Sequence, residues 1–259
     1  KLDTSRLSAD PLRTYALGHF AIQASELSST EWRAFSFPTL AANGTPEILR
    51  RLLRRKHTPV IRERHYAFDP TVLDTPAPCH LQGYWQSPKY FASIEAAIRT
   101  EFTVKDPLEG ENRDLANRIR DCIAVSLHLR RGDYVDNAQT NRYHGICGPE
   151  YYEAAEKLLL RYSEAIELFV FSDDPVWAEE NLHFRSPVTV LRHNGPERDY
   201  EDLRLMTMCR HHIIANSTFS WWGAWLCAHA DKMVVAPKNW FREAGHDTTD
   251  LIPEAWVRI

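Results

Sequence analysis

The stretch Ile123-Ala-Val-Ser-Leu-His-Leu-Arg-Arg-Gly-Asp-Tyr134 decides the fold of this chain. An apolar run that charged residues and a glycine close abruptly is typical of a buried strand whose carboxyl end opens into a loop. Side chains alternate between the faces of a strand, so we expect His128 and Arg130 to point one way and Arg131 the other. Two guanidinium groups at a strand end suit a multiply charged anion, because each offers a planar fork of donors. A surface arginine pair that Asp133 neutralises is an equally open interpretation of the dipeptide alone.

Around this stretch, apolar runs alternate with helical patterns. Strands are predicted over 122–129, 167–172, 188–191, 212–216 and 232–236, and helices over 149–162, 175–182, 199–209 and 220–229. Strands that alternate with helices of this length predict βαβ units and a parallel, doubly wound α/β sheet. The first 118 residues are less regular, with a strand-like stretch over 81–87 and helical patterns over 46–56 and 90–102.

The composition excludes several classes of protein. Of 259 residues, 44% are hydrophobic and 25% charged, which is ordinary for a globular protein. A formal net charge of -4 argues against general nucleic-acid binding, so any anion site must be local. Five scattered cysteines without a C-x-x-C pair indicate reduced thiols, neither a disulfide framework nor a structural zinc site. Neither a transmembrane segment nor a signal peptide is visible.

Polar side chains gather at three predicted strand ends, which share one edge of a parallel sheet. The first end carries the two arginines, the second Asp173 and Asp174, and the third Asn216-Ser-Thr-Phe-Ser220, which leads into a helix. Taken singly, Ser217 or Thr218 could only cap that helix, and the two aspartates could only form a turn and a cap.

Together, the three strand ends suggest a nucleotide diphosphate. Arginine and a helix N-terminus fit a diphosphate, and a carboxylate fits an N–H edge of the kind that guanine presents. The chain has no G-x-G-x-x-G and no G-x-x-x-x-G-K-[ST], so neither a Rossmann dehydrogenase nor a P-loop enzyme is indicated. No D-x-D triplet occurs in this region either, so arginine would balance the pyrophosphate charge in place of a metal.

The segment His128-Leu-Arg-Arg-Gly-Asp-Tyr134 resembles the H-x-R-R-G-D-Y motif of the inverting alpha-1,2-fucosyltransferases. Similar segments extend over essentially the whole chain: 83–87, 89–91, 171–175, 199–206, 215–225, 237–241 and 252–256. Members of this family open with a strand and a G-G-L-G-N-Q-type loop ahead of a segment like Leu2-Asp-Thr-Ser5, and we expect this opening to be missing here.

The resemblance implies a GT-B-like fold of two Rossmann-like domains. Residues 1–118 would form the acceptor-side domain and 119–240 the GDP-fucose-binding domain, with 241–259 as a tail that packs back on the first. The implied reaction is the inverting transfer of L-fucose from GDP-fucose to a galactoside hydroxyl, without metal or cofactor. The expected partners are GDP-fucose and a galactoside-terminated glycan, and the expected location is cytoplasmic or peripheral to the inner membrane, as for a bacterial-type enzyme. Transfer with another linkage, such as alpha-1,6, and a non-catalytic GDP-sugar or glycan-binding module are the alternatives.

The resemblance also implies roles for individual residues. By this resemblance, Arg130 would hold the pyrophosphate and stabilise the leaving group. The residues themselves offer Asp133 as the second catalytic candidate, or only as a brace for an arginine. They also offer Trp85 as an acceptor-binding residue that stacks on a sugar, or as a core residue. The implied donor-binding residues are His128, Arg130, Arg131, Asp173, Asn216, Ser217, Thr218, Phe219 and Ser220. Asp133, Asp136 and His144 are open candidates for a general base.

Overall fold

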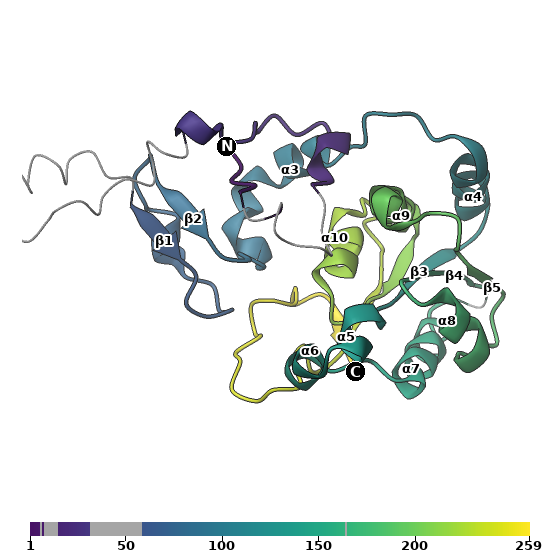
Figure 1. Ribbon diagram of the computed structural model, residues 1–259. Helices are drawn as coiled ribbons and strands as arrows, with labels where there is room; N and C mark the ends of the chain where they lie inside the picture. Colours follow the sequence, from purple (N-terminus) through teal and green to yellow (C-terminus); the bar gives the residue numbers. More distant parts are fainter. Residues whose placement is uncertain (6, 8–14, 32–58, 164) are drawn as a thin grey trace, which may run out of the picture.

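A six-stranded parallel sheet with helices on both faces forms most of the molecule (Figure 1). The computed structural model describes residues 1–5, 7, 15–31, 59–163 and 165–259. The strands are β3 Ala124–Leu129, β4 Glu167–Ser172, β5 Val188–Val190, β6 His211–Ile213, β7 Val234–Ala236 and β8 Val257–Arg258. Their order is β5-β4-β3-β6-β7-β8, which runs outward from β3 in both directions. This is the doubly wound topology that the sequence predicts.

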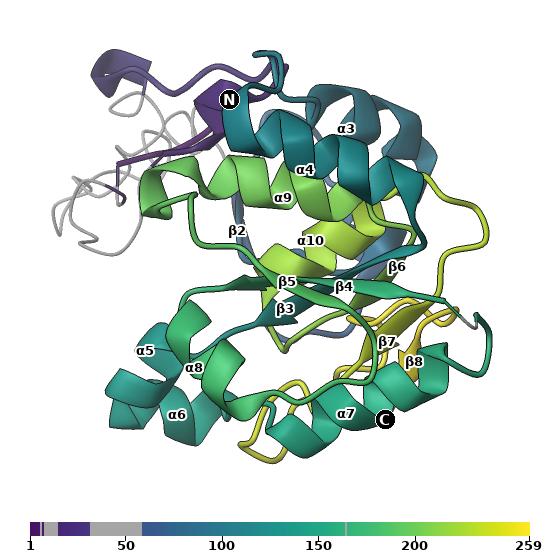
Figure 2. The same cartoon turned by 90° about the vertical axis from the view of Figure 1, so that its right-hand side faces the viewer.

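Helices cover the two faces of this sheet (Figure 2). One face carries α4 Gly110–Asp121, α9 Asp199–Met208 and α10 Thr218–Leu226, and the other α5 Gly132–Asp136, α6 Ala138–His144, α7 Pro149–Leu159 and α8 Pro175–Asn181. The alternation expected for β3 is confirmed: Leu127 packs with Tyr152 of α7, whereas Ala124 packs with Ile119 of α4. All six residues of β3 are buried, which explains its continuous apolar run.

The part upstream of the sheet, from residue 59 onward, holds a two-stranded parallel sheet of β1 Val60–Arg62 and β2 His80–Gln82. The predicted strand over 81–87 is wrong beyond Gln82. The carboxylate of Glu63 accepts hydrogen bonds from the backbone N–H groups of Tyr84 (2.7 Å) and Trp85 (3.1 Å). Trp85 has a φ of 51°, in the left-handed region, so the chain leaves the extended conformation there.

The predicted helix over 90–102 is shorter than expected. Two 3-10 turns, η4 Pro88–Tyr90 and η5 Ala92–Ile94, precede α3 Glu95–Glu101. Further 3-10 turns are η2 Leu17–His19, η3 Pro70–Val72 and η6 Pro196–Arg198. The helical pattern at 46–56 lies outside the described residues. Within the described residues, no helix has the length and apolar composition that crossing a membrane requires.

The last residues of the chain contact both parts of the molecule. Asp250 accepts a hydrogen bond from the N–H of Phe68 (2.9 Å) and pairs with Lys89, both upstream of the sheet. Further along, β8 adds an unpredicted sixth strand beside β7. The division into two Rossmann-like domains stays a prediction.

Candidate active site at the carboxyl edge of the sheet

The strand order reverses between β3 and β6, which are neighbours in the sheet. At such a switch point, the connections that follow the two strands diverge to opposite faces and leave a crevice, where α/β proteins bind ligands. Arg130 and Arg131 directly follow β3, and the turn that begins α10 follows β6. The sequence prediction that these strand ends share one edge is therefore confirmed.

Arg130 is held between two carboxylates at this edge. Its Nη2 donates to Oδ1 of Asp133 (2.6 Å) and its Nη1 donates to Oδ2 of Asp173 (2.8 Å). The sequence predicts a loop after β3, but the chain turns at once into the short helix α5. Asp133 lies in the first turn of this helix, three residues after Arg130. The guanidinium carbon of Arg130 also lies 5.5 Å from the ring centroid of Tyr134.

Arg131 is fixed in a different direction. Its Nε donates to Oδ2 of Asp174 (3.1 Å), and its guanidinium stacks 3.8 Å from the ring centroid of Trp177 in α8. Asp174 also caps α8, because its Oδ1 accepts from the N–H of Trp177 (3.2 Å), so the interpretation of this aspartate as a cap is confirmed. Arg131 thus joins the end of β3 to α8.

Asp173 is hydrogen-bonded to both arginines, one through its side chain and the other through its backbone. Besides pairing with Arg130, it accepts a hydrogen bond from the backbone N–H of Arg131 (2.8 Å). A Cβ added at Gly132 would lie 2.6 Å from Oδ2 of Asp173, so any other residue here would displace this carboxylate from its present position. The Arg-Gly step of the motif therefore lets Asp173 reach both arginines.

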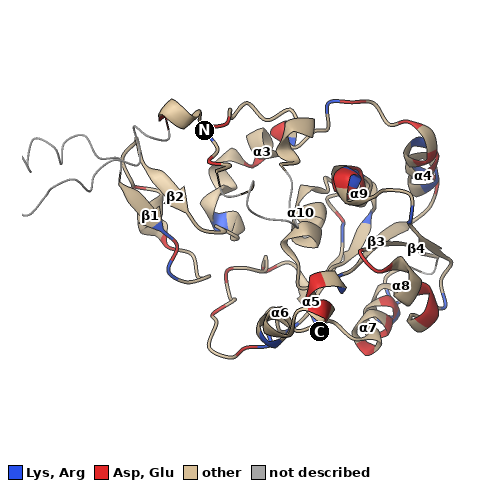
Figure 3. Ribbon diagram, viewed as in Figure 1, with Lys and Arg blue, Asp and Glu red and all other residues tan. Residues whose placement is uncertain are grey.

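The five charged side chains of this edge sum to a negative charge. Two guanidinium groups face three carboxylates, those of Asp133, Asp173 and Asp174. Figure 3 shows the acidic residues of α5 in red beside the end of β3. An incoming diphosphate would therefore compete with a carboxylate for the N–H groups of Arg130.

The turn before α10 is tied to the protein by Asn216 and Ser220. Nδ2 of Asn216 donates to the carbonyl oxygens of His144 (2.9 Å) and Trp240 (3.2 Å). Ser220 is fully buried, and its Oγ donates to the carbonyl oxygens of Ala215 (3.4 Å) and Ser217 (3.2 Å). Both predicted donor-binding side chains are engaged within the protein, where they shape the turn.

Ser217, Thr218 and Phe219 are the other predicted donor-binding residues of this turn. Ser217 precedes α10, yet its side chain makes no capping hydrogen bond, so the interpretation that it caps the helix is wrong. Its hydroxyl is left for another partner at the helix N-terminus. Thr218 is exposed, and the ring of Phe219 lies 5.5 Å from that of His128. The contact between Phe219 and His128 joins the first turn of α10 to the end of β3.

His128 is buried and carries no charge at neutral pH. Burial, aided by the nearby positive charge of Arg130, lowers the pKa of His128 to about 3. Its Nδ1 is buried without a hydrogen-bond partner among the described residues. An unpaired buried nitrogen calls for an explanation, and this one lies two residues before Arg130, near the end of β3.

The three candidate bases lie on helices, where the sequence predicts a loop. Asp136 is exposed at the end of α5, and Asp133 pairs with Arg130. His144 ends α6 and stacks on the ring of Tyr134 at 4.7 Å. Burial lowers the pKa of His144, an effect that Asp133 opposes and Arg130 reinforces. A neutral imidazole beside Asp133 is able to accept a proton.

Tyr134 closes the His-x-Arg-Arg-Gly-Asp-Tyr motif, but no role for it is predicted from the sequence. Its hydroxyl donates to the carbonyl oxygen of Asn216 (3.3 Å), which ties α5 to the turn before α10. Its ring also contacts Arg130 and His144. A tyrosine directly after Arg-Arg-Gly-Asp was the available signal, but only the tertiary contacts give it a function.

Trp85, the predicted acceptor-side residue, lies in the upstream part of the molecule. It lines a cavity together with β1 and the segment that follows β1.

A parallel sheet wound outward from β3 in both directions, with helices on both faces, defines a doubly wound α/β protein. Residues 50–259 match the family model described as Glycosyl transferase family 11, and the chain belongs to this family.

Similar proteins agree with this assignment. The chain is 37% identical to an Alpha-1,2-colitosyltransferase of Escherichia coli, over 68% of this chain and 61% of that protein. It is 38% identical to the O-antigen biosynthesis glycosyltransferase WbnK of the same species (59% and 54%), and 31% identical to Galactoside alpha-(1,2)-fucosyltransferase 1 of Lagothrix lagotricha (69% and 52%). The chain therefore spans between about half and three fifths of these relatives. A solved glycosyl transferase family 9 structure from Veillonella parvula aligns at a TM-score of 0.35 and 10% identity, covering 82% of this chain and 66% of that one.

Proposed function

We propose that this protein transfers L-fucose from GDP-fucose to a galactoside hydroxyl, forming an alpha-1,2 linkage with inversion. The observation that carries this proposal is the place of Arg130, which directly follows β3 at the switch point, where the turn into α10 follows the neighbouring strand β6. The family and the names of the relatives support glycosyl transfer of this kind.

In the proposed reaction, the acceptor oxygen forms a bond to the anomeric carbon of fucose while the bond to the GDP oxygen breaks on the opposite face. The electron pair of the broken bond stays on the diphosphate, so negative charge grows there in the transition state. Arg130 and the N-terminal N–H groups of α10 supply positive charge at that position. We propose that they do so without a metal.

Asp133 would change partners during this reaction. In the free protein its carboxylate is engaged by Arg130 (2.6 Å). When the diphosphate takes the N–H groups of Arg130, Asp133 is released and can accept the proton of the attacking hydroxyl. His144, whose ring stacks on that of Tyr134, is the next candidate for that proton.

The decisive experiment measures GDP release from GDP-fucose with a panel of galactosides, with and without EDTA. Turnover should survive EDTA and fall by about 10²- to 10³-fold in Arg130→Ala, because the charge at the leaving group is lost. Arg113→Ala is the control, since Arg113 is an exposed arginine of α4. Equal turnover in Arg130→Ala would contradict the role of Arg130, and loss of turnover in EDTA would contradict the metal-free reaction.

A colitosyl donor is the second candidate, because a relative at 37% identity is named for colitosyl transfer. The same assay with fucosyl and colitosyl donors separates the two by their kcat/KM. Analysis of the linkage in the product tests alpha-1,2 against alpha-1,6. Binding of GDP without turnover of either donor would favour a non-catalytic binding module.

A further inference from the structure

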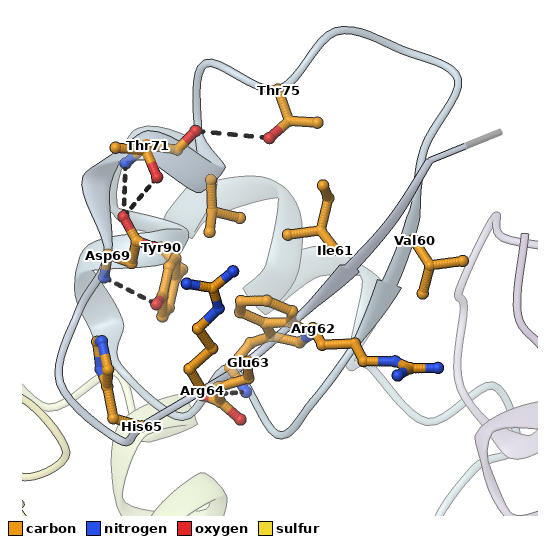
Figure 4. A pocket seen from close by; sticks show the side chains of 12 residues that line it. Val60, Ile61, Arg62, Glu63, Arg64, His65, Asp69, Thr71, Thr75 and Tyr90 are labelled. Atoms are coloured by element: carbon orange, nitrogen blue, oxygen red, sulfur yellow. Dashed lines mark hydrogen bonds between the residues drawn. The ribbon is translucent and has the colours of Figure 1, made fainter. Parts of the chain in front are cut away.

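A cavity of about 670 Å³ opens between β1 and the segment that follows it (Figure 4). Its lining residues are Val60 to His65, Asp69, Thr71, Val72, Thr75, Trp85 and Tyr90. The volume lies within the range of ligand pockets and is sufficient for one or two sugar rings. None of the donor-site residues described above lines it.

Two aromatic side chains form part of the wall and are held rigidly. The ring of Trp85 meets that of Tyr90 edge to face, with centroids 5.4 Å apart. The hydroxyl of Tyr90 accepts a hydrogen bond from the N–H of Asp69 (2.9 Å). Trp85 is kept at a φ of 51° by the hydrogen bonds that Glu63 accepts. A bulky residue in this strained conformation is a mark of functional sites, where surrounding contacts maintain the strain.

The polar groups of the wall are mixed and balanced in charge. Arg62 and Arg64 offset Glu63 and Asp69. Arg62 donates to Gln82 (3.1 Å) and points away from the centre of the cavity, whereas Arg64 points into it (Figure 4). Arg64 is exposed, and in Figure 4 no hydrogen bond joins its guanidinium to the other side chains drawn, so its donors can reach a ligand.

These groups suit an uncharged, hydroxyl-rich ligand. A pyranose has an apolar C–H face that packs on an aromatic ring, and hydroxyls that both donate and accept. Because the two guanidinium groups are matched by two carboxylates, an added negative charge on the ligand would gain nothing from the wall as a whole.

The cavity wall leads directly to the helix that carries His144. Tyr66 follows the lining segment, and its hydroxyl shares a hydrogen bond with that of Tyr143 (2.9 Å). The ring of Tyr143 lies 4.8 Å from that of His144, which stacks in turn on Tyr134 at the donor site. Contacting side chains thus connect Tyr66, which follows the lining segment, to Tyr134, whose ring lies 5.5 Å from the guanidinium carbon of Arg130.

We propose that this cavity binds a neutral pyranose of the acceptor glycan, next to the sugar that receives the fucose. Trp85 is its stacking platform and Arg64 donates to its hydroxyls. The inference rests on the proposed function where it calls this glycan an acceptor. Binding of a neutral glycan can nevertheless be measured without turnover.

The test measures binding of two ligands separately by calorimetry. The first ligand is a neutral galactosyl disaccharide, which is compared with an analogue that carries a uronate as its second sugar. The second ligand is GDP. The variants are Trp85→Ala, Arg64→Gln, Arg130→Ala and the control Arg113→Gln. Far-ultraviolet circular dichroism checks that each variant is folded.

We expect Trp85→Ala and Arg64→Gln to weaken disaccharide binding by about 10-fold or more while GDP binding is kept. Arg130→Ala should show the reverse, and the uronate analogue should bind the wild-type protein no better than the neutral disaccharide. Unchanged disaccharide binding in both folded variants, no binding of the disaccharide, or preference for the uronate would overturn the inference. Failure of GDP binding and of turnover would instead overturn the proposed function.

Discussion

At the scale of single residues, the two carboxylates on Arg130 are the main constraint on the site. Asp133 and Asp173 take one N–H group each from opposite arms of the guanidinium. In the free protein, carboxylates therefore balance the positive charge of Arg130. A diphosphate must bind Arg130 more strongly than these carboxylates do. Charge-assisted hydrogen bonds to phosphate provide that preference.

The first prediction concerns Asp133→Asn. Removing the competing charge should tighten GDP binding by about 3- to 10-fold, because Arg130 then lacks one of its anionic partners. Turnover should fall by about 10²-fold or more, because the proposed base is lost. Calorimetry with GDP and steady-state kinetics check both effects, with Asp121→Asn on α4 as the control. Weaker GDP binding in Asp133→Asn would mean that Asp133 positions Arg130 and does not compete for it.

The second prediction concerns pH. The pKa of His128 falls from its ordinary 6.5 to about 3, so the folded protein keeps this group neutral while the unfolded chain protonates it below about 6.5. Its contribution to stability is present above pH 6.5 and is lost as pH falls through that value toward 3. At pH 5 the loss amounts to about 2 kcal/mol.

Urea unfolding of the wild-type protein and His128→Gln at pH 7.5 and pH 5 measures this effect as a difference. The wild-type free energy of unfolding should drop by about 2 kcal/mol more than that of the variant. The comparison with the variant matters because Asp202 acts in the opposite sense: burial raises its pKa to about 6, so its contribution is lost as pH rises. Identical pH dependence of the two proteins would show that His128 titrates normally.

At the scale of elements, α10 presents its N-terminus to the site and has its C-terminus neutralised by two cations. Nζ of Lys232 donates to the carbonyl oxygens of Ala224 (2.8 Å) and Cys227 (2.6 Å). Arg99 of α3 donates to the carbonyl oxygen of Leu226 (2.6 Å) and stacks on Trp225. Positive charge at this end complements the helix dipole and satisfies carbonyl groups that lack helical partners.

The third prediction follows from this arrangement. Lys232→Met should lower the free energy of unfolding by about 2–4 kcal/mol, because partly buried carbonyl oxygens lose a charged donor. Lys238→Met is the matched control, since Lys238 is exposed, and its effect should stay within about 0.5 kcal/mol. Urea denaturation compares the three proteins. Equal stability of the two variants would show that water replaces the ammonium group at no cost.

At the scale of the whole molecule, the loop at 241–250 fastens the upstream part to the sheet. Asp250 binds the N–H of Phe68 and the ammonium of Lys89, and the Lys89 partner lowers the pKa of its carboxyl group. Phe241 packs on Tyr66, with ring centroids 4.7 Å apart. These contacts set how the proposed acceptor cavity meets the donor site.

The fourth prediction tests this fastening with Asp250→Ala. Hydrogen exchange should become faster in residues 63–69, which lose an anchor, while β3 and β4 in the sheet core should exchange as before. Turnover should fall several-fold if the two parts must stay aligned. Asp247→Ala is the control, because the carboxylate of Asp247 is hydrogen-bonded locally, by Thr249, whose N–H lies 2.9 Å from it. Unchanged exchange at 63–69 would contradict the role of Asp250.

The sequence by itself determined the sheet, its parallel winding and the family. Each of these depends on local patterns: apolar runs of strand length, helical spacing between them, and an Arg-Arg-Gly-Asp segment at a strand end. Such patterns are read within ten or twenty residues, so no distant contact is needed to recognise them. The meeting of the strand ends followed from the topology alone.

Only the tertiary structure decided the partners of these residues. The pairing of β3 with β4 brings Asp173 to Arg130, and Glu63 bends the chain at Trp85 from more than twenty residues away. Ser220 lies in the core, where its hydroxyl donates to the carbonyl oxygens of Ala215 and Ser217. Whether a polar side chain is free or hydrogen-bonded depends on partners that are distant in the sequence. Buried polar groups must find such partners, and only the tertiary structure shows which ones they are.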